Sequence, residues 1–206
     1  MTAADYVPVP PSLPKLRKAV QGCQGCALYQ NATQAVFGEG DVSARLILVG
    51  EQPGNQEDLD GRPFVGPAGK LLDGILAEAG ISRDDVYVTN IVKHFKWEPQ
   101  GTRRLHKRPS AREVAACRPW FDAERAALSP GGIVCLGATA AQALLGRLFR
   151  ITVQRGQIQP QLSGAWIIAT WHPSAVLRVP DRTGRDRMRS ELVADLKTAA
   201  ENLKMN

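Results

Sequence analysis

The stretch RLILVG at residues 45–50 is an almost unbroken run of apolar residues. Three runs of the same kind follow it along the chain: VYVTN at 86–90, GIVCLG at 132–137 and WIIATW at 166–171. Short, near-continuous apolar runs are typical of strands that are buried on both faces of a parallel sheet. The sequence therefore predicts four strands of one mainly parallel sheet.

Segments with helical spacing lie between and after these runs. They are GPAGKLLDGILAEAG at 66–80, SAREVAACRPWFDAERAAL at 110–128, ATAAQALLG at 138–146 and RDRMRSELVADLKTAAENLK at 185–204. This alternation predicts an α/β fold: one domain over residues 1–206, with a central four-stranded sheet flanked by helices. The four prolines near the start predict an extended lead-in at residues 1–14.

Composition limits the class of protein. The 206 residues carry a formal net charge of +6, and no apolar run approaches the roughly 20 residues that span a bilayer. The first residues lack the pattern of a signal sequence, so we expect a cytoplasmic protein that contacts no membrane. We also expect a monomer. The basic charge fits a nucleic-acid partner, although solvated lysines and arginines on an ordinary surface would also produce it.

The spacing of the four cysteines indicates a candidate metal or cluster site. Cys23 and Cys26 make a C-x-x-C pair, and Cys117 and Cys135 follow much later in the chain. Because disulfides are rare in the cytoplasm, this spacing favours a metal or cluster site. Alternatively, Cys117 and Cys135 are small buried apolar residues and the C-x-x-C is a redox pair. Thiolates bind zinc and iron–sulfur clusters alike, so the residue types do not distinguish the two.

Polar residues follow each predicted strand. They belong to GEQPG, NIVKHFK, GATAA and HPS, which come after the four strands in chain order. In open α/β sheets the ligand lies beyond the carboxyl ends of the strands. We therefore expect the functional site to be assembled from these four segments.

The segment 93–112 is strongly basic. It holds seven lysines and arginines and one acidic residue, Glu98, with Phe95 and Trp97 between them. This pattern is typical of a surface that faces phosphates, where arginines add affinity without sequence preference. His106 differs from the cations around it, because a largely neutral imidazole has a free lone pair near neutral pH.

Several motifs together resemble the uracil-DNA glycosylase superfamily. They are GEQPGNQEDLDGRPFVGPAG at 50–69, TNIVKHF at 89–95, the cysteine pattern and HPS at 172–174. The resemblance runs from about Cys23 to the C-terminus and is closest to the iron–sulfur family four. The insert GTRRLHKRPS resembles the histidine loop of the UdgX subgroup, whose members attach covalently to uracil-containing DNA. The resemblance implies the uracil-DNA glycosylase fold and a 4Fe–4S cluster held by Cys23, Cys26, Cys117 and Cys135.

The resemblance also implies roles for individual residues. Phe64 would stack on uracil, Asn90 would bond to its O4/N3 edge, and His172 would stabilise the departing base anion. Glu51 would bond to His106 and orient it, and His106 would capture C1′ of the sugar. Further expected uracil-pocket residues are Gln52, Asp58 and Ser174. Expected DNA contacts are Arg103, Arg104, Lys107, Arg178 and the intercalating pair Val176 and Leu177.

Three functions are compatible with these features. The first is a single-turnover uracil-DNA glycosylase that becomes linked to the abasic sugar through His106, on single-stranded or double-stranded DNA. The second is a conventional family-four enzyme that turns over many times and uses the basic segment only to contact DNA. The third is a noncatalytic DNA-binding module that a metal stabilises.

Overall fold

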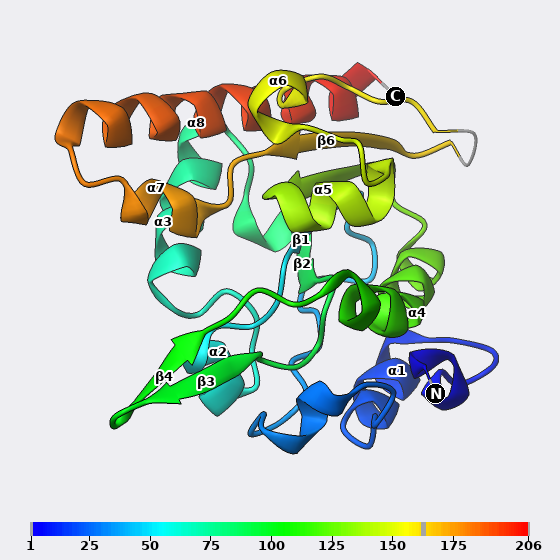
Figure 1. The fold of residues 1–206 in the computed structure, drawn as a ribbon. Coiled ribbons are helices and arrows are strands. Elements are labelled where there is room, and N and C mark those ends of the chain that lie inside the picture. Colours follow the sequence, from blue (N-terminus) through cyan, green and yellow to red (C-terminus); the bar gives the residue numbers. More distant parts are fainter. Residues whose placement is uncertain (1, 162–163, 206) are drawn as a thin grey trace.

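The computed structural model describes residues 2–161 and 164–205. A four-stranded sheet lies at the centre, with the strand order β2–β1–β5–β6 (Figure 1). All three neighbouring pairs are parallel, which confirms the predicted α/β fold. The strands are β1 (Leu46–Gly50), β2 (Val86–Asn90), β5 (Gly132–Leu136) and β6 (Trp166–Thr170).

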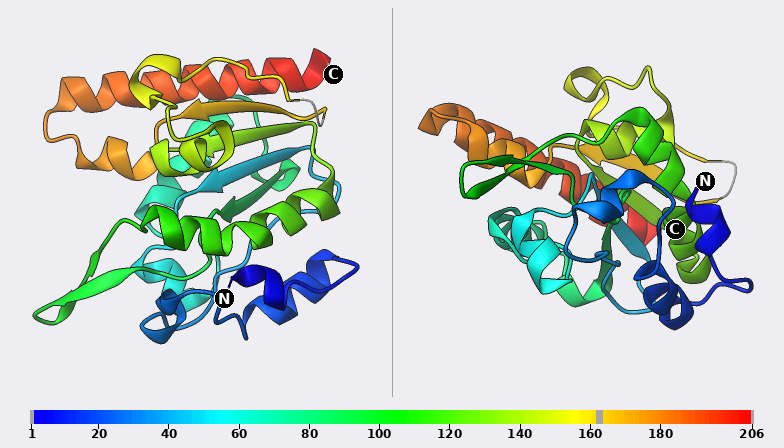
Figure 2. Two further views of the ribbon diagram at one scale, coloured as in Figure 1. Left: turned by 45° about the vertical axis from the view of Figure 1, so that its right-hand side comes forward. Right: turned by 60° about the horizontal axis from the view of Figure 1, so that its bottom comes forward.

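Helices cover both faces of this sheet (Figure 2). Side chains alternate along β1, so that Ile47 and Val49 join one apolar core and Leu46 and Leu48 join the other. The first core includes α1 (Leu13–Val20), α4 (Ala111–Leu128) and α5 (Ala138–Leu145). The second includes α3 (Pro67–Glu78), α7 (Pro173–Arg178) and α8 (Arg182–Met205). The strands are therefore buried on both faces, as their continuous apolar runs predict.

The predicted helices begin and end close to their expected limits. Ser110 caps α4, where its side chain and that of Glu113 exchange hydrogen bonds with each other's backbone N–H groups. After α3 the chain turns at Gly80, whose φ of 74° favours glycine. None of the helices in the described part of the chain is long and apolar enough to cross a membrane.

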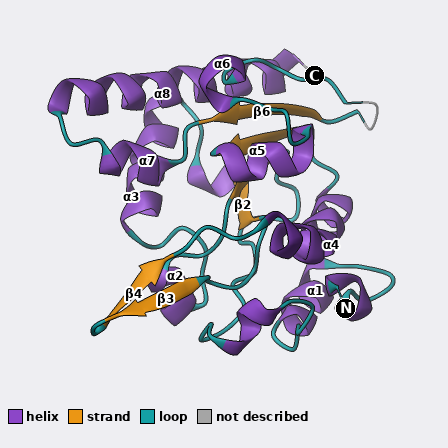
Figure 3. Ribbon diagram, in the orientation of Figure 1, coloured by secondary structure: helices purple, strands orange, loops and turns teal. Residues whose placement is uncertain are grey.

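Several short elements were not predicted, because they contain too few residues to show a period. They are α2 (Asn55–Asp60), α6 (Ile151–Gln154), α7 and the 3₁₀ turns η2 (Ala27–Gln30) and η3 (Arg83–Asp85), and Figure 3 separates them from the loops. The most important of them is α7, because it contains Val176 and Leu177, the pair that was expected to intercalate.

The basic segment also contains a β-hairpin. Strand β3 (Trp97–Gln100) pairs with β4 (Arg103–His106) in antiparallel register, and His106 lies opposite Trp97. Gly101, with φ of 58°, allows the tight turn between them. Figure 1 shows the hairpin projecting from the body of the protein below the carboxyl ends of the strands.

The prediction of an extended lead-in at residues 1–14 is wrong in two places. Residues Ala3–Tyr6 form the 3₁₀ turn η1, which the side chains of Thr2 and Asp5 cap. Helix α1 begins at Leu13, because Pro14 at the start of a helix needs no backbone donor and has a suitable φ.

A buried ion pair supports the end of β2. Lys93 Nζ lies 2.5 Å from Glu124 Oε2, and neither side chain is exposed to solvent. Lys93 also donates to Thr89 Oγ1 and to the backbone oxygen of Asn90, and Glu124 accepts from the hydroxyl of Tyr87. The pair therefore connects α4 to the strand end where Asn90 lies.

We predict that Lys93→Met lowers the free energy of unfolding by about 3–5 kcal/mol, because it leaves the Glu124 carboxylate buried without a cation. Urea unfolding followed by circular dichroism measures this change. The double variant Lys93→Met/Glu124→Gln should recover most of the loss, since a neutral amide oxygen still accepts from Tyr87. Lys197→Met, at an exposed position of α8, is the matched control, and a Lys93→Met variant as stable as this control would contradict the prediction.

Candidate active site

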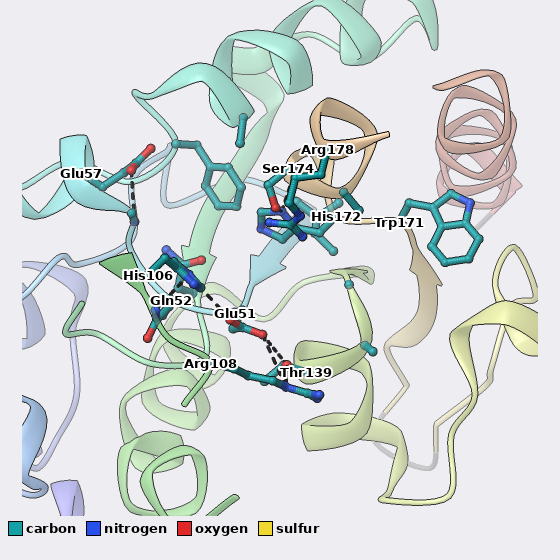
Figure 4. A pocket seen from close by; sticks show the side chains of 18 of the residues that line it. Glu51, Gln52, Glu57, His106, Arg108, Thr139, Trp171, His172, Ser174 and Arg178 are labelled. Carbon is teal, nitrogen blue, oxygen red and sulfur yellow. Dashed lines mark hydrogen bonds and ion pairs between the residues drawn. The ribbon is translucent and has the colours of Figure 1, made fainter. Parts of the chain in front are cut away.

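A cavity of about 460 Å³ lies at the carboxyl ends of the strands (Figure 4). It is lined by residues that follow all four strands, as predicted. Among its lining residues are Glu51, Gln52, Phe64, Asn90, His106, Arg108, Thr139, Trp171, His172, Ser174 and Arg178. Side chains that are far apart in the sequence therefore meet in one pocket.

Gly50, the last residue of β1, lies beside three of the residues that line this pocket. A Cβ atom at Gly50 would lie 2.4 Å from Asn90 Oδ1, 2.8 Å from Phe64 Cζ and 3.4 Å from His172 Nε2. These three atoms therefore converge over Gly50, and any side chain at this position would push them apart. The structure brings together the three residues that were expected to contact the base.

Asn90 offers an unused hydrogen-bond acceptor in the pocket. The residue is 3% exposed, and its Oδ1 is buried with no hydrogen-bond partner in the described part of the protein. A buried acceptor without a partner lowers stability by about 1–3 kcal/mol. A ligand that donates an N–H at this point would satisfy it.

Phe64 is held in an unusual backbone conformation. Its φ is 56°, which is rare for a residue other than glycine. Its ring lies 6.2 Å from the His172 ring, at an interplanar angle of 25°. Behind it, Gly69 of α3 allows close approach, because a Cβ there would lie 1.7 Å from the Phe64 carbonyl oxygen. The position of the ring is thus set by backbone packing.

His172 presents a proton donor to the pocket. The backbone N–H of Ser174 donates to His172 Nδ1 at 3.1 Å, so Nδ1 carries no proton and Nε2 is the N–H nitrogen of the neutral ring. Burial and then the charge of Arg178 lower the pKa of His172 to about 4. The ring is therefore neutral at physiological pH, with Nε2–H beside Asn90 and Phe64.

His106, at the end of β4, is held by Gln52. The two Nε2 atoms are 3.0 Å apart, and Gln52 Oε1 accepts from the N–H of Lys96 at 3.1 Å. This second bond identifies the nitrogen of the Gln52 amide, which is a donor, as the atom that faces His106. The Nε2 atom of His106 is therefore the acceptor and carries the lone pair.

Glu51 lies next to His106, but the expected hydrogen bond is absent. Glu51 Oε1 is 3.8 Å from His106 Nε2, a distance typical of an ion pair rather than a hydrogen bond. Its other oxygen, Oε2, accepts from Thr139 Oγ1 at 2.5 Å and lies 3.9 Å from Arg108 Nε. Burial lowers the pKa of His106, and the carboxylate of Glu51 opposes this shift. Glu51 thus stabilises the protonated ring without touching it.

Two residues expected to contact uracil instead support the hairpin. Gln52 lines the pocket, but its amide also donates to the backbone oxygen of Lys107. Asp58 is fully buried, where it accepts from Thr33 and from Arg104 Nη1 at 2.6 Å. Both polar groups are occupied by protein partners, which the residue types alone did not reveal.

Arg104 was expected to contact phosphate, but it anchors the hairpin. Its guanidinium bonds to Asp58 and to both oxygens of Asn55, and its side chain is only 19% exposed. It also lies over the rings of Phe95 and Trp97, with its Cζ atom 5.5 Å and 5.4 Å from their centres. Little of its donor capacity remains for DNA.

The other residues expected to contact DNA differ in their exposure and in whether they are paired within the protein. Arg103 is exposed on the hairpin, whereas Lys107 pairs with Glu98 at 2.8 Å. Leu177 and Arg178 are exposed at the end of α7. Val176, expected to intercalate beside Leu177, is 1% exposed and packs in the core, because it lies on the inner face of that helix.

The four cysteines belong to the same apolar core, on the face covered by α1, α4 and α5. All four thiols are free of disulfides. Trp120 Nε1 donates to Cys23 Sγ at 3.2 Å, and the N–H of Lys93 donates to Cys117 Sγ at 3.3 Å. Among the described residues, no three Cys, His, Asp or Glu side chains are arranged to hold a metal ion.

Thr139 and Arg108 are site residues that the sequence analysis did not single out. Arg108 Nε donates to Thr139 Oγ1 at 3.0 Å, and Thr139 donates in turn to Glu51. Thr139 belongs to the GATAA segment after the third strand, one of the four segments from which the site was expected to be assembled. This position could have indicated Thr139 as a site residue. Its contact with Glu51 depends on how the strands pair.

Comparison with known proteins agrees with this geometry. Residues 37–197 match the family model of the uracil DNA glycosylase superfamily. A type-4 uracil-DNA glycosylase of Thermotoga maritima is 43% identical over 77% of this chain and 80% of its own. One of Archaeoglobus fulgidus is 36% identical over 92% of both chains. The chain therefore belongs to the uracil DNA glycosylase superfamily and is a homologue of the type-4 uracil-DNA glycosylases.

Proposed function

We propose that this protein excises uracil from DNA, the activity for which its type-4 relatives are named, and that His106 then captures the sugar. The observation that carries the proposal is the position of His106. Its lone-pair nitrogen lies 3.8 Å from a carboxylate, in the same pocket as Asn90, Phe64 and His172. This arrangement suits the UdgX-type reaction that the inserted hairpin suggests.

Base selection would depend on Asn90. Uracil carries an N–H at N3, which the unpartnered Oδ1 of Asn90 can accept. Cytosine presents a lone pair at N3 instead, so two acceptors would face each other without a proton between them. The Phe64 ring would stack on the flipped base and compensate for part of the lost stacking in DNA.

His172 would stabilise the leaving group. When the C1′–N1 bond breaks, its electron pair leaves with uracil as an anion. The neutral His172 ring can donate its Nε2–H to uracil O2 and does not need to be protonated. A fixed donor in a closed pocket is most effective for charge that develops in the transition state.

His106 would then form the new bond. Its Nε2 lone pair leaves the Gln52 amide and attacks C1′, so that a C1′–N bond forms and the imidazole becomes a cation. The uracil anion takes a proton from solvent, and Glu51 offsets the charge of the ring. A positioned group can have an effective concentration of about 10⁵ M or more, far above that of water.

Two alternatives make different predictions. A conventional glycosylase would release uracil well beyond one equivalent per protein and leave no bond to DNA. A noncatalytic DNA-binding module would release none. Membership of a glycosylase superfamily and the unpartnered acceptor of Asn90 favour a catalytic protein over a noncatalytic DNA-binding module.

A denaturing gel tests the capture directly. After incubation with a single-stranded oligonucleotide that contains one uracil, the protein should run as a slower, SDS-resistant band. His106→Ser should lose this band and release uracil, because water can reach C1′ where the imidazole stood. The control is Lys107→Ser, on the same segment, which removes a different nucleophile and should keep the band. Crosslinking by His106→Ser would refute His106 as the nucleophile.

The rate of capture should depend on pH through His106. The neutral ring is the nucleophile, so capture is complete above its pKa and declines as pH falls through it. Since burial lowers this pKa below its ordinary value of about 6.5, the decline should begin at a more acidic pH than for an exposed histidine. His172, with a pKa of about 4, stays neutral over the same range.

Glu51→Gln separates the effect of the carboxylate on the pKa of His106 from its effect on the rate of capture. Removing its charge lowers the pKa of His106 further, so the acid limb should shift to lower pH. The plateau rate should fall by roughly 10²-fold, because the imidazolium loses its counter-charge. Single-turnover rates of adduct formation between pH 8 and pH 5 measure both changes, and an acid limb that moves to higher pH would be inconsistent with this role.

We further propose that Cys23, Cys26, Cys117 and Cys135 hold a 4Fe–4S cluster. The four thiols share one core, and N–H groups donate to two of the sulfur atoms, as is common around cluster ligands. Such a cluster would join the N-terminal segment to α4 and β5, a structural role. It supplies no step in the excision described above.

Purified protein should therefore be brown, absorb near 400 nm and contain iron and sulfide. Cys117→Ser should lose most of this absorbance, since it removes one of the four ligands. A colourless wild-type protein with one zinc ion per chain would instead support the zinc-stabilised alternative.

A further inference from the structure

A second hollow, of about 710 Å³, lies between α4 and α5. It adjoins the active-site pocket, because Arg108 and Thr139 line both. Its remaining lining residues are Pro109, Ala111, Val114, Ala115, Arg118, Gln142, Ala143 and Arg147. We call this hollow the α4–α5 groove.

The groove combines an apolar wall with cationic side chains. On the α4 side, Ala111, Val114, Ala115 and Arg118 recur at the spacing of one helix face. Three arginines and no acidic residue line the groove among the described residues. This composition suits a ligand with both apolar surface and negative charge.

The three arginines differ in how free they are. Arg118 is engaged by Asp122 and by the backbone oxygen of Ala143, so it forms part of the wall. Arg108 contacts Thr139 and Gln142 and lies 3.9 Å from Glu51 Oε2, but its side chain is still 61% exposed. Arg147 is exposed beyond the end of α5. Arg108 and Arg147 can therefore meet an anion from solution at two points along the groove.

The charge of the surrounding chain favours the same ligand. No aspartate or glutamate occurs between Glu124 and Asp181, whereas this stretch contains five arginines: Arg125, Arg147, Arg150, Arg155 and Arg178. Of these, Arg147 lines the groove, and Arg155 is paired with Glu191 and Asp195. The hairpin cations Arg104 and Lys107 are also paired, with Asp58 and Glu98. Arg147 is thus a cation of the groove that is exposed and has no ion-pair partner among the described residues, as is Arg103 on the hairpin.

We propose that the α4–α5 groove holds the single strand of DNA that adjoins the uracil nucleotide on one side. Backbone phosphates would lie on Arg108 and Arg147, and a base or sugar would contact Val114, Ala115 and Ala143. The inference rests on the proposed function, since it takes DNA as the substrate. It extends that function, because it assigns the path of the strand to the side of the pocket formed by α4 and α5.

Fluorescence anisotropy with an unreactive ligand tests this path. A single-stranded oligonucleotide with 2′-fluoro-deoxyuridine resists excision, so binding is measured without capture. Arg147→Glu should weaken binding about tenfold and reduce the slope of log K against log salt by about 0.7, the value for one phosphate contact on a single strand. Arg147→Lys should keep most of the wild-type affinity and most of the wild-type salt dependence, since a lysine also neutralises a phosphate.

Oligonucleotides shortened on one side of the uracil locate the contact. Removing the flank in the groove should abolish the difference between Arg147→Glu and wild type, while removing the other flank should preserve it. Arg45→Glu, exposed before the amino end of β1, is the matched control for a change of two charges. Equal effects of Arg147→Glu and Arg45→Glu, or an effect independent of both flanks, would overturn the proposal. Because no bond to DNA forms, these outcomes do not depend on capture by His106.

Discussion

The close approach of three side chains over Gly50 is the constraint on which the site depends. Asn90 ends β2, Phe64 lies in the loop before α3 and His172 caps the start of α7, and they meet only because Gly50 leaves room. The parallel register sets Gly50 opposite Asn90, and the Lys93–Glu124 pair supports that strand end from below. The unpartnered Asn90 oxygen and the strained Phe64 backbone lie at this point. Both features lower the stability of the fold at the place where a base would bind.

The hairpin places His106 at the edge of this pocket. Arg104 fastens β4 to Asn55 and Asp58, and Gln52 binds the chain on either side of the hairpin through Lys96 and Lys107. These contacts hold the backbone of His106 at the pocket edge. Arginine and glutamine therefore contribute by positioning the histidine, and this role explains why so much of their hydrogen-bonding capacity is used within the protein.

The sheet and its main helices could be predicted because apolar runs and helical spacing are local signals, and because ligands of α/β sheets gather at the strand ends. The direction of individual side chains could not. Asp58 and Gln52 have the chemistry of base-contacting residues, but each is engaged by partners more than twenty residues away. The hairpin likewise depends on Arg104, whose partners come from α2 and from Thr33. The burial of Val176 could not be predicted either, because the formation of α7 determines which side chains of this segment face the core.

The side-chain amide of Gln52 bears directly on the proposed reaction, because it holds the nitrogen atom of His106 that would attack. Because the Gln52 nitrogen donates to His106 Nε2, it keeps that atom unprotonated and sets the tautomer in which the ring proton lies on Nδ1. The same bond must break before Nε2 can attack. Gln52 can release the ring at low energetic cost, since its nitrogen has two other acceptors, the backbone oxygens of Lys96 and Lys107. Gln52 thus holds the histidine in the tautomer that the proposed capture requires, although Gln52 does not depend on this bond for a partner.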